Sequence, residues 1–202
     1  MRTDPSTFVN PHGLANKVGR LVWHVVWMVL FRPSPWFMGA WRSWLLRLFG
    51  AKIGFVRLHS SVRVWAPWRL KMGSHVYVDR DVYLYNAYGL EVGDRVVISF
   101  GSVLCTASHD YRRSAFPLTG KQITVGSDVW IAAEAFVAPG VSIADGGVVG
   151  ARAMVTRDVA AWTVVSGNPA VQVRERVVVD APEASRSAAS GASDGSLRAA
   201  RA

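Results

Sequence analysis

Acidic residues and cysteine are scarce in this sequence. Fourteen Asp and Glu residues stand against 23 Lys and Arg residues, which leaves a formal net charge of +9. Such a balance favours an anionic partner, such as nucleic acid, lipid headgroups or a phosphorylated ligand. The basic residues are spread along the chain, so nucleic-acid binding has little support. The single cysteine, Cys105, excludes an internal disulfide and fits a reducing compartment, so we expect a cytoplasmic protein.

The N-terminal part lacks a long apolar run. The run over residues 21–31 is 11 residues long and contains His24, whereas a membrane-spanning helix needs about 20 apolar residues. Residues 36–50 mix Trp and Leu with Arg. We expect residues 15–50 to form amphipathic helices that either pack only on the protein or also rest on a membrane surface. Residues 1–14 are expected to be flexible and show no secretory signal.

A six-residue repeat runs through residues 51–179. Six consecutive hexads begin with Val or Ile at positions 125, 131, 137, 143, 149 and 155. Upstream hexads begin at positions 58, 64, 72, 78, 84, 92, 98 and 104, and every third step is eight residues long. This pattern predicts an all-β fold, a three-sided parallel β-helix with a bulge at one corner. Residues 180–202, rich in Ala, Ser, Gly and Arg, are expected to be a disordered tail.

One long interruption breaks the repeat. Residues 110–122 fit no hexad, and the step from Leu104 to Val125 falls where an eight-residue step is due. The segment is therefore expected to be a loop that leaves the bulged corner, and loops on rigid scaffolds often carry function. His109 ends the last hexad before it. We interpret Cys105, in the same hexad, as a small core residue rather than a nucleophile.

These residues carry a resemblance to a known family. The segments LCTASHDY, VWIAAEAFVAPGVSI, VVGARAMVTRDV and WTVVSGNPA resemble hexapeptide-repeat acyltransferases, most closely the colanic-acid-biosynthesis type, and are also similar to maltose and galactoside O-acetyltransferases. The resemblance covers about residues 15–178. It implies a left-handed β-helix, a homotrimer with active sites between subunits, and acetyl transfer from acetyl-CoA to a hydroxyl, usually of a sugar or glycan.

The chemistry of this transfer needs a base. An attacking hydroxyl must lose its proton, and a neutral imidazole suits that task because its ordinary pKa lies near working pH. His109 is the best-placed candidate, and the resemblance implies that it is the catalytic base. Asp110 could orient its ring or touch the acceptor, but adjacent residues point oppositely in extended chain, which favours a loop contact. The role of Tyr111 stays open.

The acetyl-CoA site is expected above the loop. Ala133 and Ala151 are three hexads apart, so they should stack and leave a groove for an extended pantetheine arm. The resemblance implies CoA binding by Ala133, Ala151, Thr156, Arg157 and Arg174. The family commonly has Lys in place of Arg157, and an arginine where this chain has Val171.

We expect the acceptor to bind on the turns below His109. Asp79 and Asn86 resemble acceptor-contacting residues of sugar acetyltransferases, although Asn86 could instead serve the backbone of the bulge. A zinc-dependent carbonic anhydrase is disfavoured, because no histidine follows His109. The alternative from another class is a non-catalytic β-helix scaffold or membrane-recruited assembly protein. It would explain the basic, Trp-rich N-terminal part but not the loop with His109.

Overall fold

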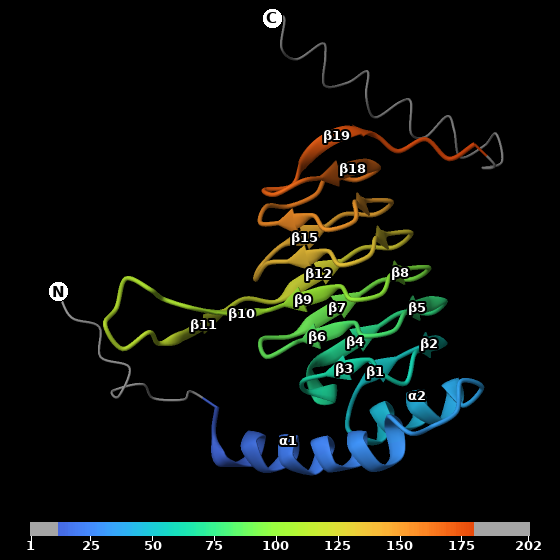
Figure 1. The fold of residues 1–202 in the computed structure, drawn as a ribbon, viewed down its shortest axis with the longest axis vertical. Helices are drawn as coiled ribbons and strands as arrows, with labels where there is room; N and C mark the ends of the chain where they lie inside the picture. Colours follow the sequence, from blue (N-terminus) through green and yellow to red (C-terminus); the bar gives the residue numbers. More distant parts are fainter. Residues whose placement is uncertain (1–11, 180–202) are drawn as a thin grey trace, which may run out of the picture.

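The protein is a β-helix with two helical segments across one end (Figure 1). The computed structural model describes residues 12–179. The predicted tail and most of the predicted flexible start lie outside the described residues.

Three parallel sheets form the sides of the β-helix, and each turn of the chain adds one strand to each sheet. Face A consists of β1 (Lys52–Ile53), β4 (Leu70–Met72), β7 (Leu90–Val92), β12 (Ile123–Val125) and β15 (Ser142–Ile143). Face B consists of β2 (Val56–Leu58), β5 (Val76–Val78), β8 (Val97–Ile98), β13 (Trp130–Ile131), β16 (Val148–Val149) and β18 (Thr163–Ser166). Face C consists of β3 (Arg63–Val64), β6 (Tyr83–Tyr85), β9 (Val103–Cys105), β14 (Phe136–Val137) and β17 (Met154–Val155).

The hexad count gives the strand register. Leu84 pairs with Leu104 on face C, and Val137 pairs with Val155 higher up on the same face, so the first residue of a hexad stacks on its equivalent one turn later. All four side chains are buried. An aliphatic column along each face thus forms the core, because one turn cannot bury its inner side alone. The predicted parallel β-helix is confirmed.

The N-terminal end is covered by helical segments. α1 (Leu14–Val26) continues into the π-helical η2 (Trp27–Phe31), and α2 (Gly39–Leu48) follows. The first helix therefore begins seven residues before the apolar run at 21–31. Trp23 and Trp27 lie against the first turn and donate indole N–H groups to the carbonyls of Val64 and Val62. A 3-10 turn, η3 (Pro67–Arg69), occupies the first bulge.

Within residues 12–179, the helix Leu14–Phe31 is long and apolar enough to cross a membrane, judged by length and composition.

The other end closes with a change of strand direction. β19 (Val171–Glu175) runs antiparallel to β18. Arg176 then donates to the carbonyls of Asp128 and Gly146 and lies over the Trp162 ring. These contacts hold the last strand against the top turns of the β-helix.

Candidate active site

The interruption at 110–122 is a β-hairpin rather than an irregular loop. β10 (Ala107–His109) pairs antiparallel with β11 (Leu118–Gly120), and the hairpin leaves the side of the β-helix directly after β9 (Figure 1). It departs from the corner where the chain passes from face C to face A, here called the C–A corner. This is the corner that carries the two bulges, as predicted.

His109 lies at the outer end of β10, opposite Leu118. Its Nδ1 is 2.6 Å from the carbonyl oxygen of Phe116. A carbonyl can only accept a hydrogen bond, so Nδ1 carries the proton and donates. In the neutral ring Nε2 is then the nitrogen with a lone pair. The ring is exposed, so the arrangement presents a basic nitrogen at the surface of the hairpin.

Contacts of Thr106 and Gly120 anchor the root of the hairpin. Thr106 is fully buried; its hydroxyl donates to the carbonyl of Tyr85 and accepts from the backbone N–H of Tyr88. Gly120 sits so close to the Tyr88 ring and the Thr106 carbonyl that a side chain there would collide with both. The hairpin is therefore fixed to the turn below, and His109 with it.

Asp110 holds the tip of the hairpin. Its carboxylate accepts from Nε of Arg112 at 2.9 Å and from the backbone N–H of the same residue, and Arg113 lies 3.7 Å away. Hydrogen bonding from Arg112 lowers the pKa of Asp110. These are the loop contacts that alternation favoured. Tyr111 is 81% exposed at the tip.

Asn86 does not reach the surface. Its side chain is fully buried, and its amide both accepts from Ala66 N–H and donates to Ala66 carbonyl. The predicted contact with an acceptor is therefore wrong for this residue, and the alternative role at the bulge backbone holds. The signal was available, because Asn86 follows buried Leu84 by two residues and strand alternation points both inward.

Cys105 is not a core residue. It lies on the outer side of β9, partly covered, beside Leu104, which fills the interior. Its thiol is 3.1 Å from the carbonyl of Ala107. Alternation again explains the error: the neighbour of an inward residue points outward.

A second group of predicted residues lies at another corner. Where the chain passes from face B to face C, the B–C corner, Asp79 follows β5, Ala133 follows β13 and Ala151 follows β16. Arg152 N–H donates to the Ala133 carbonyl, which confirms that Ala133 and Ala151 stand on successive turns. Asp79 caps its own corner by accepting from Arg80 N–H. The width of face C separates this corner from His109, so one chain does not bring them together.

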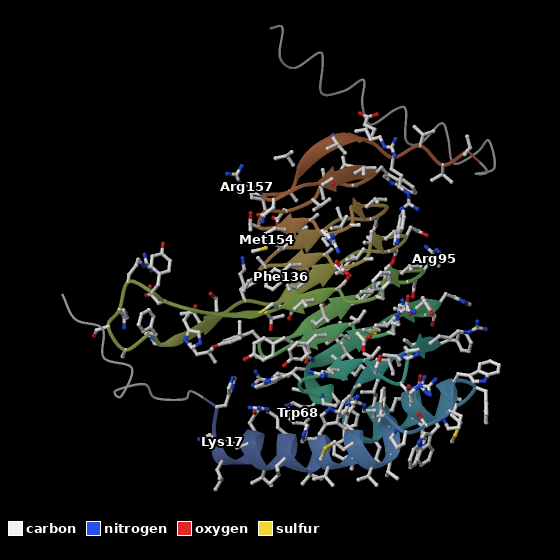
Figure 2. All side chains as sticks on the ribbon, in the orientation of Figure 1. Lys17, Trp68, Arg95, Phe136, Met154 and Arg157 are labelled. Atoms are coloured by element: carbon white, nitrogen blue, oxygen red, sulfur yellow. The ribbon has the colours of Figure 1, made fainter. Side chains whose placement is uncertain are left out.

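The remaining predicted CoA residues lie towards the C-terminal end. Thr156 and Arg157 follow β17 at the C–A corner, and both are exposed. Arg174 lies on β19, opposite Val164. Figure 2 shows Phe136, Met154 and Arg157 above the hairpin on the side from which it projects, with Arg95 on the other side. The outer side of face C is thus a strip of half-buried side chains. His109 and Arg157 lie at one edge of this strip, and the small residues Ala133 and Ala151 lie at the other.

The sequence did not predict the acceptor that holds the His109 ring, the Phe116 carbonyl. A backbone acceptor leaves no mark in residue identity, so only the fold reveals which nitrogen of His109 it holds. Among residues 12–179, no group of three or more His, Cys, Asp or Glu side chains is placed to hold a metal ion.

Comparison with known proteins gives the family. A protein of Escherichia coli K12 named as a colanic acid biosynthesis acetyltransferase, WcaF, is 44% identical over 177 residues, which cover 86% of this chain and 97% of that protein. The chain belongs to the colanic acid type of acetyltransferase. It is thus an acyltransferase, as predicted. No protein-family model matches it.

More distant relatives of this acetyltransferase agree in fold. The galactoside O-acetyltransferase of E. coli K12 is 28% identical over 130 residues, covering 60% of this chain and 64% of that protein. The structure of a hexapeptide-repeat acetyltransferase of Vibrio cholerae complexed with acetyl coenzyme A superposes with a TM-score of 0.75 at 26% identity. It covers 84% of this chain and 93% of that chain. A maltose O-acetyltransferase of Clostridium difficile gives the same TM-score at 23% identity over 82% of this chain and 90% of that one, which speaks for the fold alone.

Proposed function

We propose that the protein transfers the acetyl group of acetyl-CoA to a hydroxyl of a sugar or glycan intermediate in polysaccharide biosynthesis, with His109 as general base. The observation that carries this proposal is the His109 ring, held at Nδ1 by the Phe116 carbonyl on an anchored hairpin. It stands in a chain that is 44% identical to a colanic acid biosynthesis acetyltransferase.

The reaction follows from that tautomer. Nε2 accepts the proton of the acceptor hydroxyl while the oxygen attacks the thioester carbonyl carbon. The tetrahedral oxyanion collapses, the carbon–sulfur bond breaks, and the imidazolium returns its proton to the departing thiolate of CoA. No covalent enzyme intermediate is needed. Phe116 keeps the ring oriented throughout, because Nδ1 remains protonated in both states of the ring.

Acetyl-CoA is proposed to lie along the B–C corner, at one edge of face C. Ala133 and Ala151 leave room for the pantetheine arm beside the backbone, since larger side chains at these stacked positions would fill the groove. Thr156, Arg157 and Arg174 are proposed to bind the nucleotide end, where an arginine fork suits phosphate oxygens. Structures of similar acetyltransferases with acetyl-CoA or CoA bound support acetyl-CoA as the co-substrate.

A homotrimer would complete this site. The small residues at the B–C corner and His109 at the C–A corner belong to different edges of one chain, so each chain offers two half-sites. Packing the B–C corner of one copy against the hairpin of the next would join them, and Asp79 of that copy would then face the acceptor. Tyr111, at the exposed tip, would reach the same groove. We expect the assembly in the cytoplasm, where its thioester donor is made.

The test is thiol release from acetyl-CoA by the full-length protein with hexoses, nucleotide sugars and lipid-linked glycans as acceptors. We expect release that depends on one acceptor class, with an O-acetyl ester in the product. Thiol release that no acceptor stimulates, together with no acetylated product, would favour the scaffold alternative.

A further inference from the structure

The solvent side of the first helix is apolar. Trp23, Trp27 and Phe31 are buried against the β-helix, so the opposite side of α1 and η2 should be polar in an ordinary surface helix. Instead it carries six apolar side chains that are 48–77% exposed: Leu14, Val18, Leu21, Val25, Met28 and Val29. We call these six residues the outer face. In Figure 1 the helix lies across the base of the β-helix, so this face forms the underside of the molecule.

Aromatic residues extend the apolar surface beyond the helix. Trp36 and Phe37, in the link to α2, are 86% and 69% exposed, and Trp44 on α2 is 49% exposed. The two segments are joined, since the Trp41 indole donates to the Leu30 carbonyl. Tryptophan is favoured where an apolar phase meets water, because its ring is apolar and its N–H is polar.

The Lys, Arg, Asp and Glu residues at this end of the molecule are all of the basic kind. Between His12 and Val78 the chain has ten Lys and Arg residues and no Asp or Glu. Four of these cations, Lys17, Arg20, Arg32 and Arg63, line a groove of about 810 Å³ between the helix and the first turns of face C. The Arg20 guanidinium lies 4.0 Å from the centre of the Trp65 ring. Figure 2 shows Lys17 at the N-terminal end of the helix, beneath the hairpin. An apolar face edged by unopposed cations complements an anionic lipid surface.

The contacts of the helix decide how it would meet a bilayer. Its inner side is fixed to the first turn by the Trp23 and Trp27 hydrogen bonds, and it lies across the end of the β-helix. Crossing the bilayer would break both bonds and bury Lys17 and Arg20 in hydrocarbon. Lying in the interface breaks nothing and keeps the cations at the level of the phosphates.

We propose that the helical end of the molecule docks on an anionic lipid bilayer as a peripheral contact. The outer face and Trp36 enter the interface, and Lys17, Arg20, Arg32 and Arg63 bind lipid phosphates. The β-helix then stands on the membrane, with the hairpin of His109 projecting sideways above the lipid surface.

Vesicle sedimentation of the full-length protein tests this. We expect binding to vesicles of equal parts phosphatidylglycerol and phosphatidylcholine, weak binding to phosphatidylcholine alone, and release by concentrated NaCl. The triple variant Val18→Gln, Leu21→Gln, Val25→Gln should partition at least tenfold less. A matched control changes three exposed valines at the other end, Val171→Gln, Val173→Gln and Val177→Gln, which are 57–82% exposed, and should bind like the wild type.

A second pair of variants tests the phosphate contacts. Lys17→Gln with Arg32→Gln should lower binding to the mixed vesicles about 25-fold, since each cation near an anionic surface contributes about fivefold. Arg95→Gln with Arg152→Gln, on later turns of the β-helix, should have little effect.

Four results would overturn the proposal. Wild type that stays in the supernatant, or an outer-face variant that binds as well as wild type, would show that lipid does not cover this face. Retention after the salt wash with equal binding to neutral vesicles would indicate a spanning helix. A changed solution mass of the outer-face variant, with lipid binding intact, would make the face a contact between copies of the chain.

Discussion

Phe116 occupies a backbone conformation that is rare for a bulky residue. Its φ is +45°, in the left-handed region that non-glycine residues avoid. The hairpin tip maintains this conformation through the Asp110–Arg112 contacts and the bond from Asp110 N–H to the Pro117 carbonyl. The result is a carbonyl aimed at Nδ1 of His109. The left-handed conformation of Phe116 thus orients the carbonyl that fixes one tautomer of the His109 ring.

Asp110 is expected to influence catalysis through this geometry. Asp110→Asn removes the ion pair with Arg112 and loosens the tip, so kcat should fall about threefold to tenfold while the affinity for CoA stays the same. The measurement is steady-state kinetics over a pH range.

The pH dependence of this effect has a definite sign. The pKa of Asp110 is depressed in the folded protein. The ion pair is therefore intact at every pH above the ordinary pKa of an aspartate, and it is lost only as the pH falls through the depressed pKa. Between about pH 5 and 9 the ratio of wild-type to variant kcat should therefore be constant. A ratio that changes steeply across this range would contradict the assignment.

At the level of elements, α2 is tied to the β-helix by a buried cation. The Arg42 side chain is 3% exposed, and its guanidinium donates to the carbonyls of Leu58, Pro35 and Trp36. Burial lowers the pKa of Arg42, yet a guanidinium stays protonated at any working pH. One side chain therefore joins α2, the link before it and the first turn.

Arg42→Met should destabilise the protein by about 3 kcal/mol, because several buried carbonyls lose their donor. The measurement is the midpoint of denaturant unfolding. Arg47→Lys serves as the control: Arg47 also donates to backbone carbonyls, of Ile53 and Gly54, but it is exposed. An Arg42 variant as stable as the control would show that α2 is held by apolar packing alone.

At the scale of the whole molecule, the hexad count predicted the core and the strand register almost completely. Every turn needs an aliphatic residue at the same place, and stacking then fixes which residues pair, as with Leu84 and Leu104. The positions of residues near the corners were harder to predict. Asn86 and Cys105 were misassigned because the hexad count was used for the first place of each hexad alone, and strand alternation was not extended from that place to the two residues that follow it.

The outer face of the first helix escaped prediction for a different reason. The apolar run at 21–31 covers both sides of the helix, so periodicity did not separate Trp23, which packs inward, from Leu21, which faces solvent. Only the β-helix beneath it defines the two sides.

The proposed trimer predicts complementation between inactive variants. His109→Ala removes the base, and Ala151→Trp blocks the groove at the other corner. If each site joins the two corners from neighbouring copies, mixed trimers from equal amounts should recover about a quarter of wild-type activity. If both corners of a site came from one chain, mixing would restore nothing. Activity after co-refolding is the measurement, and each variant refolded alone is the control.

The general-base role of His109 is tested most sharply by the single-turnover rate of acetyl transfer with His109→Gln, measured beside the affinity for acetyl-CoA. If His109 is the general base, the rate should be lower by about a hundredfold or more, with the affinity for acetyl-CoA unchanged. A variant that transfers acetyl at the wild-type rate would show that His109 does not take the proton of the acceptor.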